Sequence, residues 1–315
     1  MPLFEAKKKS VPPKLLRDKY LVPPFSILDA KSGYWWDRKV LWETILKDRE
    51  NNIRNEVAKG NTPYCNPYTD TEKYHNLVSK GSISTFDPFL CEILIKWFSK
   101  PGMSVIDPFA GGCVRGIVTK LLNREYWGID ISKEQCNHNW EQWERIRKEY
   151  KIVTETNAVW ETGDSEKILS YMIAKHDMML TCPPYYNLEK YTNEKEDLSN
   201  KKTYKEFIQK YTSIIEKCYN ILRDNSFAVI VVEEIRDNNG IMYGFVPDTI
   251  NAFRECGFKY YNEMILENRV VSLKVRCPKY FDQSRKVGRH HQNVLVFYKG
   301  DEKQIEGKFG RFING

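Results

Sequence analysis

Residues 107–113 read DPFAGGC and decide the fold class of this chain. They follow an apolar, β-branched run at Met103–Ile106 and precede a helical pattern over Val114–Leu122. A strand, a tight glycine turn and a helix in this order open a doubly wound α/β unit. Pro108 ends the strand, and the glycines let the backbone approach a ligand closely. The turn has neither the GxGxxG spacing of dinucleotide sites nor the Lys-Ser/Thr of a phosphate loop, and an ordinary βα turn is the alternative for this stretch alone.

A second motif, TCPPYY at Thr181–Tyr186, follows another short apolar strand pattern at Asp177–Leu180. Two prolines cannot donate ladder hydrogen bonds, so the strand ends there. Pro183 and Pro184 each fix φ and form a stiff corner, and Tyr185 offers a flat face for stacking. Such a corner suits a planar base that carries an amino group. A rigid loop with a core tyrosine is the alternative.

Together the two motifs resemble those of the amino-methyltransferase family, which methylates exocyclic amines of adenine or cytosine in DNA. Residues 107–113 resemble its DPFxGxG motif for S-adenosylmethionine (SAM), with Gly112-Cys113 where the family has any residue and then glycine. Residues 182–185 resemble its catalytic motif, [D/N/S]-PP-[Y/F/W], with Cys182 at the polar position. Cys182 is interpreted as a variant of that position.

The resemblance extends over most of the chain. Val22–Asp29 and His291–Phe297 are similar to segments of phage-encoded DNA methylases. It implies a Rossmann-like SAM-dependent methyltransferase fold: an α/β fold with a mixed, mostly parallel sheet, helices on both faces, and added N-terminal and C-terminal recognition elements. The implied partner is DNA with a flipped target base, and no metal is required.

The implied chemistry is methyl transfer from SAM to N6 of adenine or N4 of cytosine. The amine is a poor nucleophile because its lone pair is delocalised into the ring, and the family answers by accepting hydrogen bonds from it. Cys182 is a weak acceptor, so the Pro183 carbonyl would take a larger share. Tyr185 would stack on the flipped base. The expected catalytic set is Cys182, Pro183, Pro184 and Tyr185.

An acid at the end of the second expected strand, Tyr126–Asp130, points to a nucleoside ligand. Asp130 lies 23 positions after Asp107, near the interval of about 20 residues at which an acid accepts ribose hydroxyls in βαβ units. Ile131 would cover the adenine face. Asp164 would accept the adenine amine, with a plain helix cap as the alternative.

The segment Ser84–Leu90 precedes an amphipathic helix over Glu92–Phe98, and Asp87-Pro88 is a plausible helix start. In the family a similar segment closes over the methionine end of SAM; an ordinary capped packing helix is the alternative. The expected cofactor-binding residues are Phe86, Asp87, Phe89, Asp107, Phe109, Ala110, Gly111, Asp130, Ile131 and Asp164.

Other patterns predict the rest of an α/β domain. Helices are expected over Ser132–Tyr150, Tyr204–Leu222 and Phe245–Cys256, and strands over Ser226–Val232, Tyr260–Glu267 and Asn293–Tyr298, the last of them antiparallel. The long connection 187–202 suits a lid. Trp35, Trp36 and Trp42 favour a satellite core over stacking on nucleic acid.

The positive charge is concentrated. The chain carries +7, and Arg269–Arg289 contains seven basic residues and one acid. A stretch of this kind, on a loop between the two closing strands, can follow a phosphate backbone, with a solvated basic face as the alternative. The expected DNA contacts are Arg276, Lys279, Arg285, Lys286 and Arg289.

The length and composition of the chain favour a globular protein. The chain has 315 residues, of which 29% are charged and 13% aromatic. No apolar run approaches the roughly 20 residues that span a membrane, and Met1–Lys9 does not resemble a signal peptide. The eight cysteines show no metal-ligand spacing. We expect reduced thiols and a cytoplasmic location; the sequence does not fix the oligomeric state.

About 75 positions separate Asp107 from Cys182, too few for a full recognition domain between the motifs. We divide the chain into an N-terminal arm and accessory segment, 1–80, and a catalytic domain, 81–315, with a basic recognition insertion at about 268–292. Three other functions remain open. They are an RNA or protein methyltransferase, a C5-cytosine enzyme with Cys182 as nucleophile, and an inactive nucleic-acid-binding module. The C5 enzymes place their cysteine after a proline and not before two.

Overall fold

The computed structural model describes residues 16–46, 85–154, 158–171, 174–186, 192, 194–269 and 273–312. Its centre is an eight-stranded sheet with the order β1-β7-β8-β6-β5-β2-β3-β4. The strands are β1 (Ile27–Asp29), β2 (Ser104–Asp107), β3 (Glu125–Asp130), β4 (Val159–Thr162), β5 (His176–Thr181), β6 (Leu222–Val232), β7 (Lys259–Glu267) and β8 (His291–Lys299). Only β8 runs antiparallel to its neighbours, β6 and β7. The expected mostly parallel sheet with an antiparallel last strand is confirmed.

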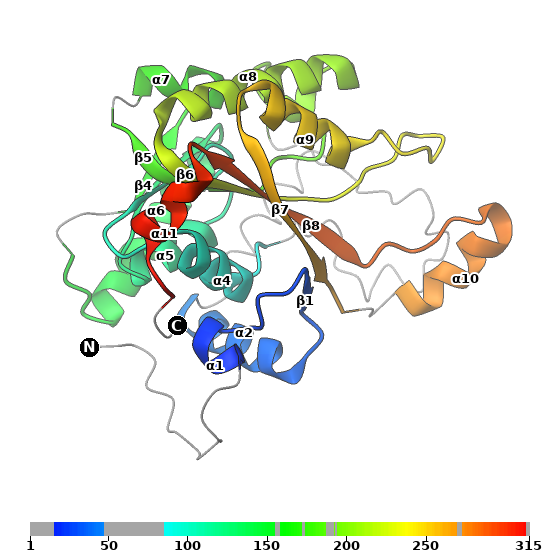
Figure 1. Ribbon diagram of the computed structural model, residues 1–315. Helices are drawn as coiled ribbons and strands as arrows, with labels where there is room; N and C mark the ends of the chain where they lie inside the picture. The colour runs from blue at the N-terminus through cyan, green and yellow to red at the C-terminus, as the bar shows by residue number, and fades with distance from the viewer. Residues whose placement is uncertain are drawn as a thin grey trace.

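Helices cover both faces of this sheet (Figure 1). They are α1 (Leu16–Tyr20), α2 (Gly33–Leu46), α4 (Pro88–Phe98), α5 (Val114–Leu121), α6 (Lys133–Glu149), α7 (Ile168–Tyr171), α8 (Tyr204–Ile221), α9 (Phe245–Glu255), α10 (Leu273–Ser284) and α11 (Ile305–Phe309), with short 3-10 turns η1 (Ser165–Lys167), η2 (Leu198–Asn200) and η3 (Glu302–Gln304). Val229 and Val231 of β6 pack in one core with α2, α4, α5 and α6. Ala228, Ile230 and Val232 pack in the other with α7, α8 and α9. Because both faces of β6 are covered, its sequence is almost continuously apolar.

Local signals set the helix ends as the sequence predicts. The Ser132 hydroxyl accepts a hydrogen bond from Gln135 N at 3.2 Å and caps α6. Gly257 follows α9 with a φ of +99°, a conformation that costs glycine little. The helices expected after the glycine turn, over 132–150, 204–222 and 245–256, are all present within one residue at each end.

The N-terminal segment differs from the expected division of the chain. β1 pairs in parallel with β7, with Leu28 opposite Leu266, so residues 16–46 belong to the same sheet and core as the catalytic domain. Trp35 and Trp42 are buried, as a core interpretation expects, whereas Trp36 is exposed and does not join that core. The Trp42 indole N–H donates to Glu92 of α4 at 2.8 Å. The remainder of the expected accessory segment lies outside the described residues.

The basic insertion contains a helix where a loop was expected. α10 lies on an arm that continues β7 and β8 beyond the body of the molecule (Figure 1). The range 273–284 contains no glycine, and Pro278 is tolerated inside the helix although it removes one backbone donor. Among the described residues no helix is both long and apolar enough to cross a membrane.

Candidate functional site

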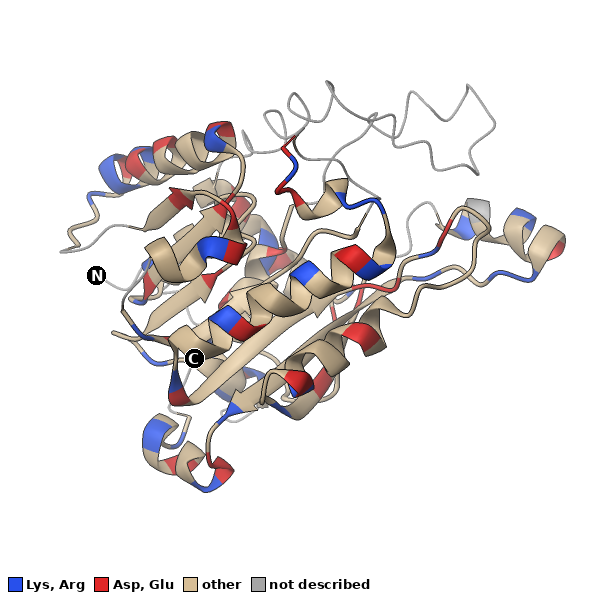
Figure 2. Ribbon diagram, turned by 90° about the horizontal axis from the view of Figure 1, so that it is seen from above, with Lys and Arg blue, Asp and Glu red and all other residues tan. Residues whose placement is uncertain are grey.

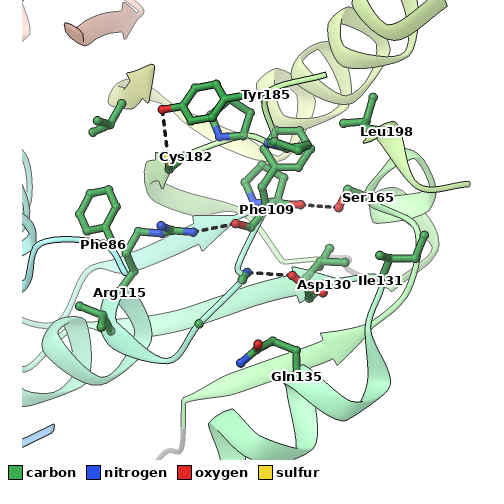
Figure 3. A pocket seen from close by; sticks show the side chains of 18 of the residues that line it. Phe86, Phe109, Arg115, Asp130, Ile131, Gln135, Ser165, Cys182, Tyr185 and Leu198 are labelled. Carbon is green, nitrogen blue, oxygen red and sulfur yellow. Dashed lines mark hydrogen bonds between the residues drawn. The ribbon is translucent and has the colours of Figure 1, made fainter. Parts of the chain in front are cut away.

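One cavity of about 530 Å³ joins the two sequence motifs. It lies where the parallel strands β2, β3, β5 and β6 end, the edge at which open α/β sheets bind ligands. The glycine turn, the end of β3 and the Pro-Pro corner all line it (Figure 3). Leu266, Asn268 and Gln292, from the far ends of β7 and β8, also line it.

The glycine turn is held against the end of β3. Gly111 has a φ of +50° and donates its N–H to Asp130 Oδ2 at 2.8 Å (Figure 3). Ala110 N donates to Ile129 O at 2.9 Å. A Cβ on Gly128 would lie 2.7 Å from the Ala110 Cβ, so the absence of a side chain there permits this close approach. The backbone of the turn therefore forms the floor of the cavity.

Asp130 is oriented by backbone donors. Its two carboxylate oxygens accept from Gly111 N at 2.8 Å and from Ser132 N at 2.9 Å, and it lines the cavity. A carboxylate can accept about four hydrogen bonds, so an oriented one can also bind ligand hydroxyls. Ile131 lines the cavity beside it. This is the arrangement that the spacing from Asp107 predicts.

Asp164 has two roles in the structure. It caps η1 by accepting Glu166 N at 3.0 Å, which is the alternative that the sequence left open. It also lines the cavity and pairs with Lys210 Nζ at 2.9 Å. The two observations are compatible because the cap fixes the direction in which the carboxylate faces.

Three residues expected to bind the cofactor do not line the cavity. Phe89 and Ala110 are fully buried core residues. Asp107 is also fully buried, and it accepts hydrogen bonds from Arg115 Nε at 2.6 Å, Thr181 Oγ1 at 2.6 Å and Tyr126 OH at 2.9 Å. Its carboxylate thus ties β2 to β3, β5 and α5, which positions the turn without facing a ligand.

Arg115 links the buried hydrogen bonds of Asp107 to the residues that line the cavity. Burial alone would lower the pKa of the guanidinium, but the Asp107 carboxylate raises the pKa of Arg115 above its usual value. Its Nη2 donates to Phe109 O at 2.6 Å (Figure 3), and its guanidinium lies 4.8 Å from the centre of the Phe86 ring. Phe86 and Phe109 both line the cavity.

The N-terminal segment supplies one cavity residue that the sequence did not indicate, Lys39 of α2. Asp87 caps α4 through Phe89 N at 2.9 Å and lines the cavity. Lys39 of α2 also lines the cavity, and its Nζ lies 3.3 Å from Asp87 Oδ2. Lys39 lies 48 positions before Asp87 in the sequence. No sequence pattern around Lys39 distinguishes it from an ordinary surface lysine.

The Pro-Pro corner presents the expected catalytic set. Cys182, Pro183, Pro184 and Tyr185 all line the cavity. The Tyr185 hydroxyl lies 4.0 Å from Cys182 Sγ (Figure 3), and the ring meets Phe245 edge-on at 6.1 Å between ring centres. Tyr186, by contrast, is buried in the core with a φ of +46°. Only the first of the two tyrosines is therefore placed to contact a ligand.

Two acids follow β6 at the same edge. Glu234 Oε1 accepts Gly244 N at 2.9 Å and Phe245 N at 2.8 Å, so this carboxylate caps α9. Glu233 lines the cavity, and burial raises the pKa of its carboxyl, with the charge of Arg289 opposing the shift.

The basic stretch Arg269–Arg289, called the basic arm below, starts beside the cavity. Asn268 and Gln292, which flank it, are cavity residues, and Lys and Arg residues occur along it (Figure 2). The Arg269 guanidinium stacks 4.3 Å from the Trp36 ring of α2. Of the expected DNA contacts, Lys279 and Arg285 are exposed, and Lys286 and Arg289 are half-buried. The side chain of Arg276 lies outside the described residues.

The sheet order, the glycine turn and the acid that ends β3 define a Rossmann-like α/β fold. Solved structures with a similar fold include TrmN from Thermus thermophilus (13% identity, covering 69% of this chain and 50% of that one, TM-score 0.43). A magnesium protoporphyrin IX methyltransferase from Synechocystis PCC 6803 with bound SAM is also similar (10% identity, 80% and 98%, TM-score 0.44). The chain spans about half the length of TrmN.

The profile of a family described as DNA methylase, of the N6/N4 methyltransferase type, matches residues 33–141 and 176–310. The chain belongs to this DNA methylase family. No curated protein matches the sequence. In the described part of the chain no cluster of three His, Cys, Asp or Glu residues could hold a metal ion.

Proposed function

We propose that this protein binds SAM and a base flipped out of DNA in the two halves of the cavity and methylates the exocyclic amine of that base. The observation that supports this most is that the glycine turn and the Pro-Pro corner, 75 positions apart in sequence, line one cavity. Family membership supports the same conclusion from the whole chain.

The chemistry of the cavity fits SAM. The cofactor offers a ribose diol, an adenine amine and a methionine ammonium, which are all hydrogen-bond donors, and the cavity offers the carboxylates of Asp130, Asp164 and Asp87. Lys39, beside Asp87, suits the methionine carboxylate. When bound, SAM supplies an electrophilic methyl group, and the protein supplies position and electrostatics.

The other half of the cavity suits a planar base. Tyr185 stacks on it, and the Pro183 carbonyl accepts a hydrogen bond from its amine. Flipping costs a few kcal/mol, which base stacking at about 1–3 kcal/mol and phosphate contacts offset. The basic arm supplies such contacts, because it leaves the cavity mouth and projects from the sheet (Figure 2).

Methyl transfer from labelled SAM to unmethylated plasmid DNA, total RNA and protein tests this proposal. We expect label in DNA, as N6-methyladenine or N4-methylcytosine after digestion and mass spectrometry. Label confined to RNA or protein, or no label with a folded protein that binds SAM, would contradict it. Sequencing of the modified plasmid sites then defines a target duplex for the experiments below.

The same assay addresses Cys182 as a nucleophile. If the cysteine is only a weak acceptor, the variant Cys182→Ser keeps substantial activity and DNA containing 5-fluorocytosine forms no covalent adduct. An adduct, together with an inactive but folded serine variant, would instead indicate C5-cytosine chemistry.

A further inference from the structure

The Pro-Pro corner of this chain lacks a strong proton acceptor. The related motif carries Asp, Asn or Ser before the two prolines, whereas this chain has Cys182, whose sulfur is a weak acceptor. The Pro183 carbonyl is neutral and cannot remove a proton. An amine that gains a methyl group becomes cationic and must lose a proton, either to water or to a nearby side chain.

The neighbouring strand brings a carboxylate to the same place. β5 and β6 pair in parallel with Thr181 opposite Ile230, so continuing the register puts Val231 level with Cys182. Both residues line the cavity. Glu233 follows two positions after Val231, just beyond the end of β6, and it also lines the cavity.

The adjacent acid is used differently. Glu234 accepts Ile235 N at 3.1 Å, Gly244 N at 2.9 Å and Phe245 N at 2.8 Å through one oxygen. It is therefore fixed at the start of α9. This anchoring sets the direction of the chain after β6. Glu234 also lines the cavity, but three backbone N–H groups already occupy its Oε1, so Glu233 is the better candidate acceptor at the corner.

We propose that Glu233 is a catalytic residue that accepts a hydrogen bond from the target amine and then takes its proton, in place of the polar residue that the related motif has at position 182. This inference rests on the proposed function. The carboxyl is suited to the role because it lines the same cavity as the corner, one strand away, and is half-buried, which favours a proton acceptor over a fully solvated carboxylate.

The transfer conserves atoms and charge. The amine nitrogen uses its lone pair to form the N–C bond, and the electrons of the broken C–S bond remain on sulfur, which becomes a neutral thioether. The nitrogen is then cationic. One of its protons passes to the Glu233 carboxylate, which leaves a neutral methylated amine, and Glu233 later releases the proton to water.

The test compares single-turnover methyl transfer by the parent, Glu233→Gln, and the double variant Glu233→Gln with Cys182→Asp, on the target duplex. General bases contribute about 10²–10⁴-fold, so we expect Glu233→Gln to lose about 100-fold or more in rate with SAM affinity within about twofold of the parent. Restoring a carboxylate at position 182 should recover about tenfold or more. Glu234→Gln is the matched control, and it should lower thermal stability while the rate stays within about threefold.

A binding measurement gives a second readout. Replacing the target base by its analogue without the amine should weaken DNA binding by the parent but leave the affinity of Glu233→Ala nearly unchanged, because both changes remove the same hydrogen bond, whereas a glutamine would keep an acceptor oxygen. A rate for Glu233→Gln within about threefold of the parent, or equal effects of the analogue on the parent and on Glu233→Ala, would overturn the role of Glu233. A parent that transfers no methyl group to DNA would instead overturn the proposed function.

Discussion

At the scale of single residues, Asp130 has the most specific expected effect on the cofactor. We predict that Asp130→Ala weakens SAM binding by about 1–3 kcal/mol, because the variant cannot accept the hydrogen bonds that a carboxylate accepts. The change also removes the acceptor of Gly111 N, which holds the glycine turn. Calorimetric titration with SAM measures the effect, with thermal unfolding as the control for fold. An unchanged affinity would remove Asp130 from the cofactor site.

We predict that replacing Asp107 lowers the stability of the fold before it affects cofactor binding directly. Asp107→Ala leaves the buried Arg115 guanidinium without its carboxylate, and breaking a buried pair in this way costs about 3–5 kcal/mol. Urea unfolding of variant and parent measures the loss. A variant as stable as the parent but unable to bind SAM would show that Asp107 contacts the cofactor directly, as its place in the motif suggests.

The sequence predicts where the site residues lie better than it predicts which side chains they bind. The expected roles of Asp130 and Tyr185 depend on where a strand ends, and strand ends are readable from apolar patterns. Asp107 sits at such an end too, yet its side chain turns inward to Arg115, Thr181 and Tyr126. No sequence pattern distinguishes an inward from an outward carboxylate, because the distinction depends on residues brought together only by the fold. Lys39 was missed for the same reason.

At the scale of elements, the contact between the glycine turn and β3 depends on Gly128. A Cβ there would lie 2.6 Å from the Tyr126 hydroxyl and 2.7 Å from the Ala110 Cβ. We predict that Gly128→Ala destabilises the protein by about 1–3 kcal/mol through overpacking, measured by urea unfolding. Gly307→Ala in α11, where a Cβ meets nothing within 4 Å, is the control and should be neutral or slightly stabilising. Equal effects would contradict the close approach.

Elements with strong periodicity or caps were predicted well, and short or irregular ones were not. α6 and α8 begin at a capping Ser or Thr and follow long helical patterns. β1 has only three residues, and its place beside β7 is set by a partner more than 200 positions away. α10 was also missed, but for a different reason. Its sequence is polar and contains Pro278, so local propensity favours a loop, yet the segment is helical.

At the scale of the whole molecule, the basic arm predicts a salt dependence. Removing one contact between a basic side chain and a phosphate should reduce the slope of log affinity against log salt by about 1. The double variant Arg285→Glu with Lys286→Glu should therefore show weaker DNA binding with a shallower slope, and unchanged SAM affinity. Filter binding over a salt titration provides the measurement.

The control for the arm is a charge reversal elsewhere. Lys148, on α6, and Lys303, in η3 beyond the opposite end of β8, are exposed lysines outside the arm. Lys148→Glu with Lys303→Glu makes the same change in net charge. If this pair alters the slope as much as the arm variant does, the effect is one of overall charge, and the arm has no special role in holding DNA.

The pairing of β1 with β7 also has a consequence for the order in which the protein is made. Residues 27–29 leave the ribosome early, but their partners, residues 265–267, follow only after most of the chain has been synthesised. Contacts between such distant segments form late because a long loop must close first. Leu266, Asn268 and Gln292 line the cavity, so a nascent chain lacks these cavity residues until its last strands are complete.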